Sequence, residues 1–167
     1  ILPLMMENLY DTKFLKFTGG EPFMIPHVRK IIKKLYEDEV SPAVRLSIIT
    51  NGTIPIDDEM LKMLLTFRHV ILLVSIDGIE DRFEYIRAGA KWKEVSANLK
   101  NFQQIAMYNK NFDLNINYLP MSINAAQDEL AEQWARSEGI SFSKSVEIYR
   151  PNYLTSVSYT HLTLPTR

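Results

Sequence analysis

Short apolar runs alternate along this chain with longer segments in which apolar residues recur every three or four positions. The short runs predict β-strands and the longer segments predict amphipathic helices, because the two structures repeat every 2.0 and 3.6 residues. The predicted strands are residues 14–17, 44–49, 70–74, 113–118 and 143–149, and the predicted helices are 26–36, 57–67, 79–86, 92–108 and 125–137. Strict alternation of this kind is typical of βα units around a parallel sheet.

This order of elements fits two α/β architectures, a doubly wound sheet and an arc of a β/α barrel. A complete eight-unit barrel needs about 250 residues, whereas this chain has 167. We therefore expect an α/β fold with a parallel sheet that is either open or an incomplete barrel. Residues 70–74 are all apolar, which predicts a strand buried on both faces.

Composition removes several classes of function. Apolar residues make up 46% of the chain and charged residues 23%, so a sizeable core is expected. The net charge of −1 provides no basic field for nucleic acid or anionic lipid, and no apolar run approaches the roughly 20 residues that span a membrane. The chain has no cysteine, which excludes disulfides, a thiol nucleophile and thiolate-held metals or clusters. Neither His27 nor His69 has a carboxylate at ligand spacing, so no metal site is predicted.

Polar and glycine residues follow four predicted strands at or near their carboxyl ends. They are residues 18–22, residues 50–52, Ser75 with Asp77, and Asn115 with Asn117. Ligands of parallel α/β folds bind beyond this edge of the sheet, so the clustering indicates a binding site there. The alternative is that these residues are ordinary turn formers.

The segment Gly19-Gly20-Glu21-Pro22 is the most informative of these. Two glycines let the backbone approach a ligand closely, and proline stiffens the exit. The chain lacks both GxxxxGK[ST] and GxGxxG, and the carboxylate of Glu21 would repel phosphate. The loop therefore favours a cationic or zwitterionic ligand.

Five segments together carry a family resemblance. They are FTGGEPFM at 17–24, TNGT at 50–53, SIDGI at 75–79, RFEYIR at 82–87 and RPNYL at 150–154. In this order and spacing the chain resembles radical S-adenosylmethionine (SAM) enzymes, more closely those that carry a twitch domain. The resemblance covers about residues 7–155 and implies a partial β/α barrel, truncated at its N-terminus.

The resemblance also implies roles for individual residues. Gly19, Gly20, Glu21 and Pro22 would receive the ammonium group of SAM, through backbone carbonyls and the carboxylate. The other implied contacts are Ser75 near the ribose, Asp77 shaping that loop, Arg87 on the SAM carboxylate, and Asn51 and Asn117 around the adenosine or substrate. Phe83, Tyr85 and Trp92 are expected to pack helices against the sheet.

The activity implied by the resemblance is reductive cleavage of SAM at a [4Fe–4S] cluster, which yields a 5′-deoxyadenosyl radical for hydrogen abstraction from a substrate. A flavodoxin or ferredoxin as electron donor, a peptide as substrate and a cytoplasmic location belong to the same expectation. The substrate itself is not identified by the sequence.

The chain departs from the family in one respect. The family's CxxxCxxC cluster loop precedes GGEP, and no cysteine is present. The resemblance therefore predicts a fragment that lacks the cluster loop, cannot bind the cluster, is inactive and binds SAM weakly. A degenerate homologue that lost its cluster is the alternative. Residues 157–166 resemble a translated sequencing adapter, which predicts a partial core domain at 1–156 and a non-native tail at 157–167.

Two other functions stay open at the level of sequence. One is a cluster-free β/α-type enzyme for small molecules, with Glu21 and Asp77 as acid and base. The other is a non-catalytic α/β interaction scaffold, in which the polar residues after the strands only form turns.

Overall fold

The computed structural model describes residues 9–145, which form one five-stranded sheet with strand order β1-β2-β3-β4-β5. Every neighbouring pair of strands is parallel. The strands are β1 Phe14–Phe17, β2 Arg45–Thr50, β3 His69–Ile76, β4 Phe112–Tyr118 and β5 Ser141–Lys144. The predicted α/β fold with a parallel sheet is confirmed. Because the order never reverses, the sheet is an arc of a β/α barrel and has no doubly wound switch point.

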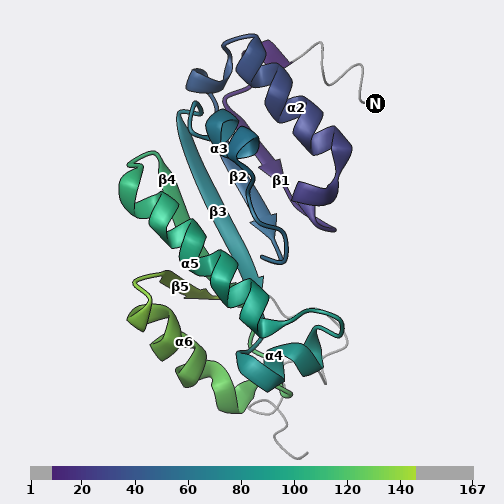
Figure 1. The fold of residues 1–167 in the computed structure, drawn as a ribbon, viewed down its shortest axis with the longest axis vertical. Helices are drawn as coiled ribbons and strands as arrows, with labels where there is room; N and C mark the ends of the chain where they lie inside the picture. Colours follow the sequence, from purple (N-terminus) through teal and green to yellow (C-terminus); the bar gives the residue numbers. More distant parts are fainter. Residues whose placement is uncertain (1–8, 146–167) are drawn as a thin grey trace, which may run out of the picture.

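Helices connect the strands and lie over one face of the sheet (Figure 1). The α-helices are α2 Pro26–Glu37, α3 Asp58–Leu64, α4 Glu80–Ile86, α5 Trp92–Tyr108 and α6 Asp128–Ser137. Four short 3₁₀ turns, η1 Leu9–Asp11, η2 Pro22–Met24, η3 Ser41–Ala43 and η4 Ala125–Gln127, complete the connections. The last strand begins two residues before its predicted start, and residues 146–149 of that prediction lie outside the described residues.

Burial alternates along β3 instead of being complete. Val70, Leu72, Val74 and Ile76 are fully buried against the helices, whereas the residues between them are partly exposed. The prediction of a strand buried on both faces was therefore wrong. Its physical reason is that an arc of barrel carries helices only on its outer face, so apolar side chains on the inner face keep some exposure in the part of the chain described.

The two helices nearest β1 and β2 follow directly from local sequence. In α2, the residues Val28, Ile31, Ile32 and Leu35 recur on one face and are buried. Helix α3 begins after Asp57, whose side chain accepts a hydrogen bond from the amide of Met60 at 2.7 Å. Residues 65–67, which were predicted to be helical, form a turn instead, because the chain must reverse there to enter β3.

The predicted aromatic packing is confirmed for two of three residues. Phe83 is fully buried, and its ring lies 5.3 Å from that of Trp92, which in turn lies 4.9 Å from Trp134. The rings therefore join α4, α5 and α6. Tyr85 was predicted wrongly, since it is 70% exposed on α4. It lies two residues from Phe83, and residues two apart on a helix point in different directions.

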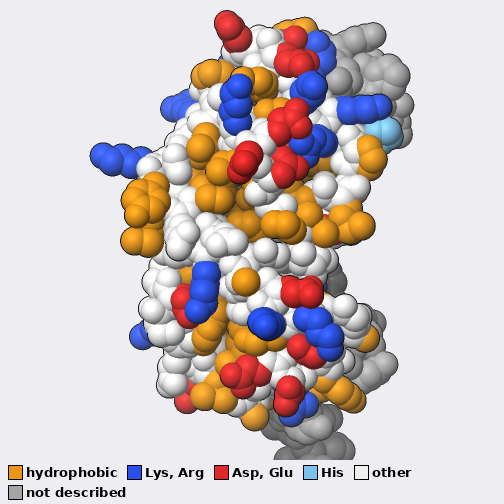
Figure 2. All heavy atoms as spheres, in the orientation of Figure 1, with side chains coloured by type: hydrophobic (Ala, Val, Ile, Leu, Met, Phe, Trp, Pro, Cys, Tyr) orange, Lys and Arg blue, Asp and Glu red, His pale blue; other side chains and the backbone are white. Residues whose placement is uncertain are grey.

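The visible surface carries no dominant charge. Figure 2 shows acidic and basic side chains mixed over the helices of both halves, in keeping with the net charge of −1. Among residues 9–145, no helix combines the length and the apolar character that a membrane crossing requires. The same residues contain no group of three side chains that would ligate a metal ion.

Candidate functional site

The loops after β1, β2 and β3 meet at the carboxyl edge of the sheet, because the strands are parallel and adjacent. The first loop holds Gly19 and Gly20 at φ of +85° and +61°. Only glycine adopts this left-handed conformation without cost. Pro22 opens the turn η2 and is buried. Both glycines of the predicted loop therefore adopt a backbone conformation that other residues rarely take.

Glu21 lies beneath this edge and is only 8% exposed. Its two carboxylate oxygens accept hydrogen bonds from Thr50 Oγ1 at 2.8 and 2.9 Å, from the amide of Asn51 at 2.9 Å and from the amide of Phe23 at 3.3 Å. The carboxylate thus joins the GGEP loop to the TNGT loop. Its predicted contact with the ammonium group of a ligand stays a prediction.

The TNGT loop is held from two further sides. Gly52 has φ of +75°, and a Cβ atom there would lie 2.9 Å from Cγ1 of Val74. Asn98 on α5 donates a hydrogen bond to the carbonyl of Gly52 at 2.9 Å. The side-chain oxygen of Asn51 accepts from both the amide and the hydroxyl of Thr53, at 2.9 and 2.6 Å. Bonds within the loop and bonds from Asn98 and Glu21 therefore hold its conformation together.

Asp77 and Arg87 form an ion pair at the same edge. Nε and Nη2 of Arg87 lie 2.9 and 2.7 Å from Oδ2 of Asp77. The side chain of Arg87 is 27% exposed and that of Asp77 is 13% exposed. Because a guanidinium has five N–H donors in a fixed plane, this pair orients Arg87 and leaves donors for a second acceptor.

A cavity of about 560 Å³ opens between the TNGT loop and the turn that follows α4, and the GGEP loop and Asp77 do not line it. It is lined by Asn51, Thr53, Ile86, Arg87, Ala88, Gly89 and Ala90. This volume lies within the range of about 300 to 1,000 Å³ that is typical of small-molecule sites. Two of the predicted binding residues, Asn51 and Arg87, therefore share one cavity.

The wall of the cavity between α4 and α5 is braced by Glu84. Its carboxylate accepts from the amide of Trp92 at 3.1 Å and from Nζ of Lys91 at 2.9 Å. These bonds, first that to Lys91, hold the pKa of Glu84 below its usual value. These bonds join α4 to the start of α5 and so hold the turn between them, which contains Arg87.

Ser75 and Asn117 lie elsewhere on the same edge. They are register partners on β3 and β4, and Asn117 is in turn the partner of Ser143 on β5. All three are partly exposed on the face of the sheet that the helices leave uncovered, as is Asn115, which accepts a hydrogen bond from Ser143 at 3.1 Å. The predicted common face of Asn115 and Asn117 is confirmed. Neither Ser75 nor Asn117 lines the cavity.

Sequence reasoning missed the residues that hold these loops in place. Thr50 bonds Glu21 of the GGEP segment, and Asn124 and Gln127 bond Asp77 and Ile79 of the SIDGI segment. Glu84 bonds Lys91 and Trp92 at the end of the turn that contains Arg87. Thr50 stands inside the TNGT segment and could have been found there. Asn124 gave no signal, because its partner Asp77 lies 47 residues away in the chain.

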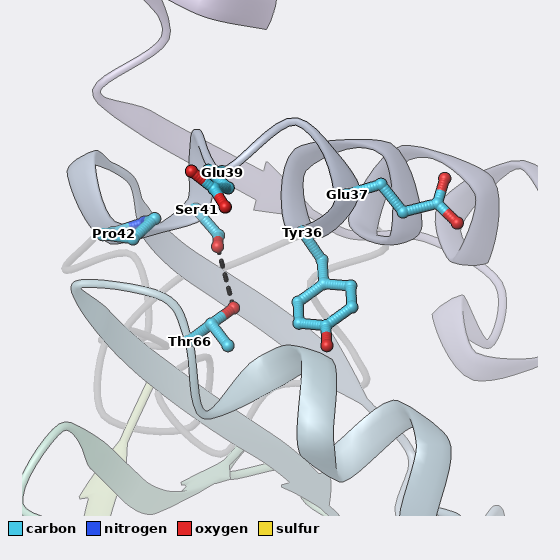
Figure 3. Close-up of a pocket in the computed structure, with 6 residues that line it drawn as sticks. All are labelled: Tyr36, Glu37, Glu39, Ser41, Pro42 and Thr66. Atoms are coloured by element: carbon cyan, nitrogen blue, oxygen red, sulfur yellow. Dashed lines mark hydrogen bonds between the residues drawn. The ribbon is translucent and has the colours of Figure 1, made fainter.

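A second cavity, of about 470 Å³, lies at the amino edge of the sheet (Figure 3). It is lined by Tyr36, Glu37, Glu39, Ser41, Pro42 and Thr66. The hydroxyls of Ser41 and Thr66 bond each other at 2.8 Å, and Thr66 also donates to the carbonyl of Met63 at 2.7 Å. Figure 3 shows the side chain of Glu37 pointing away from this pair. The two hydroxyl groups of this cavity are thus used within the fold. Ligands of parallel α/β folds bind at the other edge of the sheet.

Comparison with known families identifies the class of this protein. The model of the radical SAM superfamily matches residues 4–121. The chain therefore belongs to the radical SAM superfamily, as its GGEP, TNGT and SIDG segments predicted. No curated protein matches the chain by sequence.

Solved structures share the fold at low identity. SuiB of Streptococcus suis bound to S-adenosylmethionine matches with a TM-score of 0.60 and 14% identity, covering 85% of this chain and 32% of SuiB. The enzyme anSMEcpe with bound AdoMet and Kp18Cys peptide matches with a TM-score of 0.64 and 18% identity, covering 96% of this chain and 48% of anSMEcpe. The chain thus spans less than half the length of these structures, and its sheet is the radical SAM partial barrel.

The residues present fit SAM but not an iron–sulfur cluster. SAM carries a carboxylate, an ammonium group and a nucleoside. The cavity provides the guanidinium of Arg87 for the carboxylate and the side-chain amide of Asn51 for the polar groups of the nucleoside. A [4Fe–4S] cluster is held by thiolates, and this chain contains no cysteine. No residue of this chain therefore holds the cluster by thiolate.

Proposed function

We propose that this chain is the SAM-binding portion of a radical SAM enzyme. The observation that carries the proposal is the cavity of about 560 Å³ at the carboxyl edge, in which Arg87 is oriented by Asp77 and faces the loop of Asn51. Ligands of β/α barrels bind at this edge, and the family to which the chain belongs uses SAM.

In this proposal the free donors of Arg87 bind the SAM carboxylate, because a planar fork of N–H groups matches two carboxylate oxygens. Gly19 and Gly20 present backbone carbonyls to the ammonium group. Glu21 holds the loop against Thr50 and adds a nearby negative charge. Ser75, Asn51 and Asn117 bind around the adenosine or the substrate. SAM, when bound in such an enzyme, supplies the carbon centre for radical chemistry.

Two observations support a longer parent protein. The chain has no cysteine for a cluster, and it covers 32% and 48% of SuiB and anSMEcpe. We therefore infer a partial core domain at residues 1–156 that is inactive alone, with cluster ligands and a twitch extension supplied by other parts of the whole enzyme. Residues 157–167, the adapter-like tail, and the RPNYL segment lie outside the described residues. A peptide substrate is our proposal because anSMEcpe was solved with a peptide.

The cluster-free enzyme is the second candidate, and the geometry disfavours it. That function needs Glu21 and Asp77 as acid and base. Glu21 is buried under three donor groups, and Asp77 is paired with Arg87. Neither carboxylate is presented to a substrate, so acid–base chemistry lacks a free group at this edge.

The proposal is tested by NMR titration of the 167-residue chain with two ligands, SAM and 5′-methylthioadenosine. Methylthioadenosine lacks the amino acid end of SAM, so it cannot use Arg87 if our assignment is correct. We expect weak binding of SAM, and we expect Arg87→Ala to weaken SAM about 10-fold while leaving methylthioadenosine within about twofold.

The matched control is Arg136→Ala, which removes a 75% exposed arginine on α6. It should change neither affinity. Equal losses of SAM and methylthioadenosine in Arg87→Ala would show that Arg87 only supports the fold. Absence of any SAM-dependent shift at Asn51 or Arg87 in the unaltered chain would overturn the proposed function.

A further inference from the structure

Two amide side chains from the connection between β4 and α6 reach the SIDG loop after β3. Asn124 is 1% exposed, and its side chain is fully used. Its Nδ2 donates to the carbonyls of Asp77 and Leu119, both at 2.9 Å, and its Oδ1 accepts from the amide of Met121 at 2.6 Å. A buried amide with three bonds fixes both segments that it joins, because breaking it leaves buried groups without partners.

Gln127 holds the next part of the same loop. Its Oε1 accepts a hydrogen bond from the amide of Ile79 at 3.0 Å. The same oxygen would lie 2.9 Å from a Cβ atom at Gly78, so it packs directly on the glycine. Gly78 therefore leaves the room in which Gln127 gives the loop amide a partner.

The connection that carries these two amides is itself anchored to the sheet. The hydroxyl of Tyr118, at the end of β4, is buried and donates to the carbonyl of Asn124 at 3.2 Å. Burial is the first cause that raises the pKa of Tyr118, followed by the charge of Asp128. The phenol therefore stays protonated and remains a donor over the usual pH range.

The two amides hold the backbone that carries the ion pair of Asp77 and Arg87. Asn124 bonds the carbonyl of Asp77, whose carboxylate orients Arg87. Gln127 bonds Ile79 at the start of α4, the helix that ends directly before Arg87. Both ends of the Asp77–Arg87 pair thus depend on the same connection.

We propose that Asn124 and Gln127 form a clamp that positions the SIDG loop, and through Asp77 the guanidinium of Arg87, for binding SAM. The bonds of the clamp to the loop backbone are independent of any ligand, whereas its effect on SAM binding rests on the proposed function. The two amides are positioning residues, since neither lines the cavity.

Gln127 gives the cleaner test, because two nearly isosteric variants differ in one property. Gln127→Glu keeps an acceptor for the amide of Ile79, and Gln127→Met removes it. Backbone amide hydrogen exchange and SAM affinity are both measured by NMR on the 167-residue chain. We expect Gln127→Met to speed exchange at Ile79 by about 10-fold and to weaken SAM by about threefold to 10-fold. Gln127→Glu should stay within about twofold in both measurements.

Asn124→Asp provides a second variant. It keeps the acceptor for Met121 but places a carboxylate oxygen against the carbonyl of Asp77, so it should weaken SAM at least as much as Gln127→Met. Methylthioadenosine again serves as the second ligand, and its affinity should fall less, because it makes no use of Arg87.

The outcomes separate the clamp from the function. Unchanged exchange at Ile79 in Gln127→Met would overturn the clamp. Faster exchange with unchanged SAM affinity would overturn its role in positioning Arg87. Absence of SAM binding by the unaltered chain would overturn the proposed function and the link to SAM, while the exchange at Ile79 would still decide the clamp.

Discussion

The two edges of the sheet each carry a cavity of similar volume, about 560 Å³ at the carboxyl edge and about 470 Å³ at the amino edge. They differ in whether a buried carboxylate holds the loops beside the cavity. At the carboxyl edge, buried side chains such as Glu21 and Asn124 bond backbone groups 30 and 47 residues away. At the amino edge, Ser41 and Thr66 bond each other, and Glu37 is exposed.

This difference shows that cavity size does not separate a binding site from a gap between elements. A ligand site needs backbone groups that are fixed before the ligand arrives, because ordering them on binding lowers affinity. The carboxyl edge meets this condition with a carboxylate and two amides that reach across the fold. At the amino edge, the amide of Asn111 also reaches across the fold, to the carbonyls of Leu65 and Phe67 at 3.0 and 2.9 Å. The two carboxylates that line the cavity there, Glu37 and Glu39, are exposed and hold no loop from within.

The largest expected effect that tests this comparison is the loss of Glu21. Glu21→Ala should lower the free energy of unfolding by about 3–5 kcal/mol, since it leaves the hydroxyl of Thr50 and two amides without their buried acceptor. Ser41→Ala at the amino edge should cost about 1 kcal/mol, because Thr66 keeps its bond to Met63. Urea denaturation measures both. Equal costs at the two edges would remove the distinction.

How much of this could be predicted from sequence follows from the range of each interaction. The strands and helices follow from periodicity, and the GGEP loop follows from glycines that need left-handed backbone at Gly19 and Gly20. The exposed face of β3 could not be predicted. A run of apolar residues looks the same in the sequence whether helices cover one face of the sheet or both faces. Asn124 could not be predicted either, because nothing local distinguishes an asparagine in a turn from one that bonds Asp77.

The second prediction concerns two glycines of the carboxyl edge that differ only in surroundings. Both have positive φ, +75° at Gly52 and +92° at Gly89, but a Cβ at Gly52 would meet Val74 at 2.9 Å and Val95 at 3.3 Å, while one at Gly89 meets nothing within 4 Å. Gly52→Ala should therefore cost about 2–4 kcal/mol, for strain and overpacking together. Gly89→Ala should cost about 1 kcal/mol, for strain alone. Similar costs in thermal denaturation would show that the TNGT loop moves to make room.

The third prediction uses the exposed rim of the carboxyl edge. Asp57 caps α3 and pairs with Arg29, and the hydrogen bond from Arg29, followed by that from the amide of Met60, holds the pKa of Asp57 below its usual value. Asp57→Ala should cost about 1 kcal/mol at pH 7, whereas Asp57→Asn keeps the cap and should cost less.

The pH dependence of these variants has a defined sign. Because the folded pKa of Asp57 lies below its unfolded value of about 3.9, its contribution is present above that value and is lost as pH falls through the folded pKa. Both variants should therefore lose less stability than the unaltered chain as the pH falls below about 4. Parallel pH profiles for all three proteins would contradict the role of the Arg29 pair.

The smallest expected effect has the opposite sign and lies at the amino edge. Glu39 has φ of +58°, and it follows α2 at the position where helices usually place glycine, with the amide of Val40 bonded to the carbonyl of Leu35 at 3.0 Å. Glu39→Gly relieves about 1–2 kcal/mol of backbone strain and adds about 0.5–1 kcal/mol of unfolded-chain entropy, so a net gain of about 0.5–1 kcal/mol is expected. Lys33→Gly, at an exposed position inside α2, should instead lose about 1 kcal/mol. A loss in Glu39→Gly would mean that the glutamate side chain stabilises the amino edge by more than its backbone strain, and the two edges would then differ less than their loops indicate.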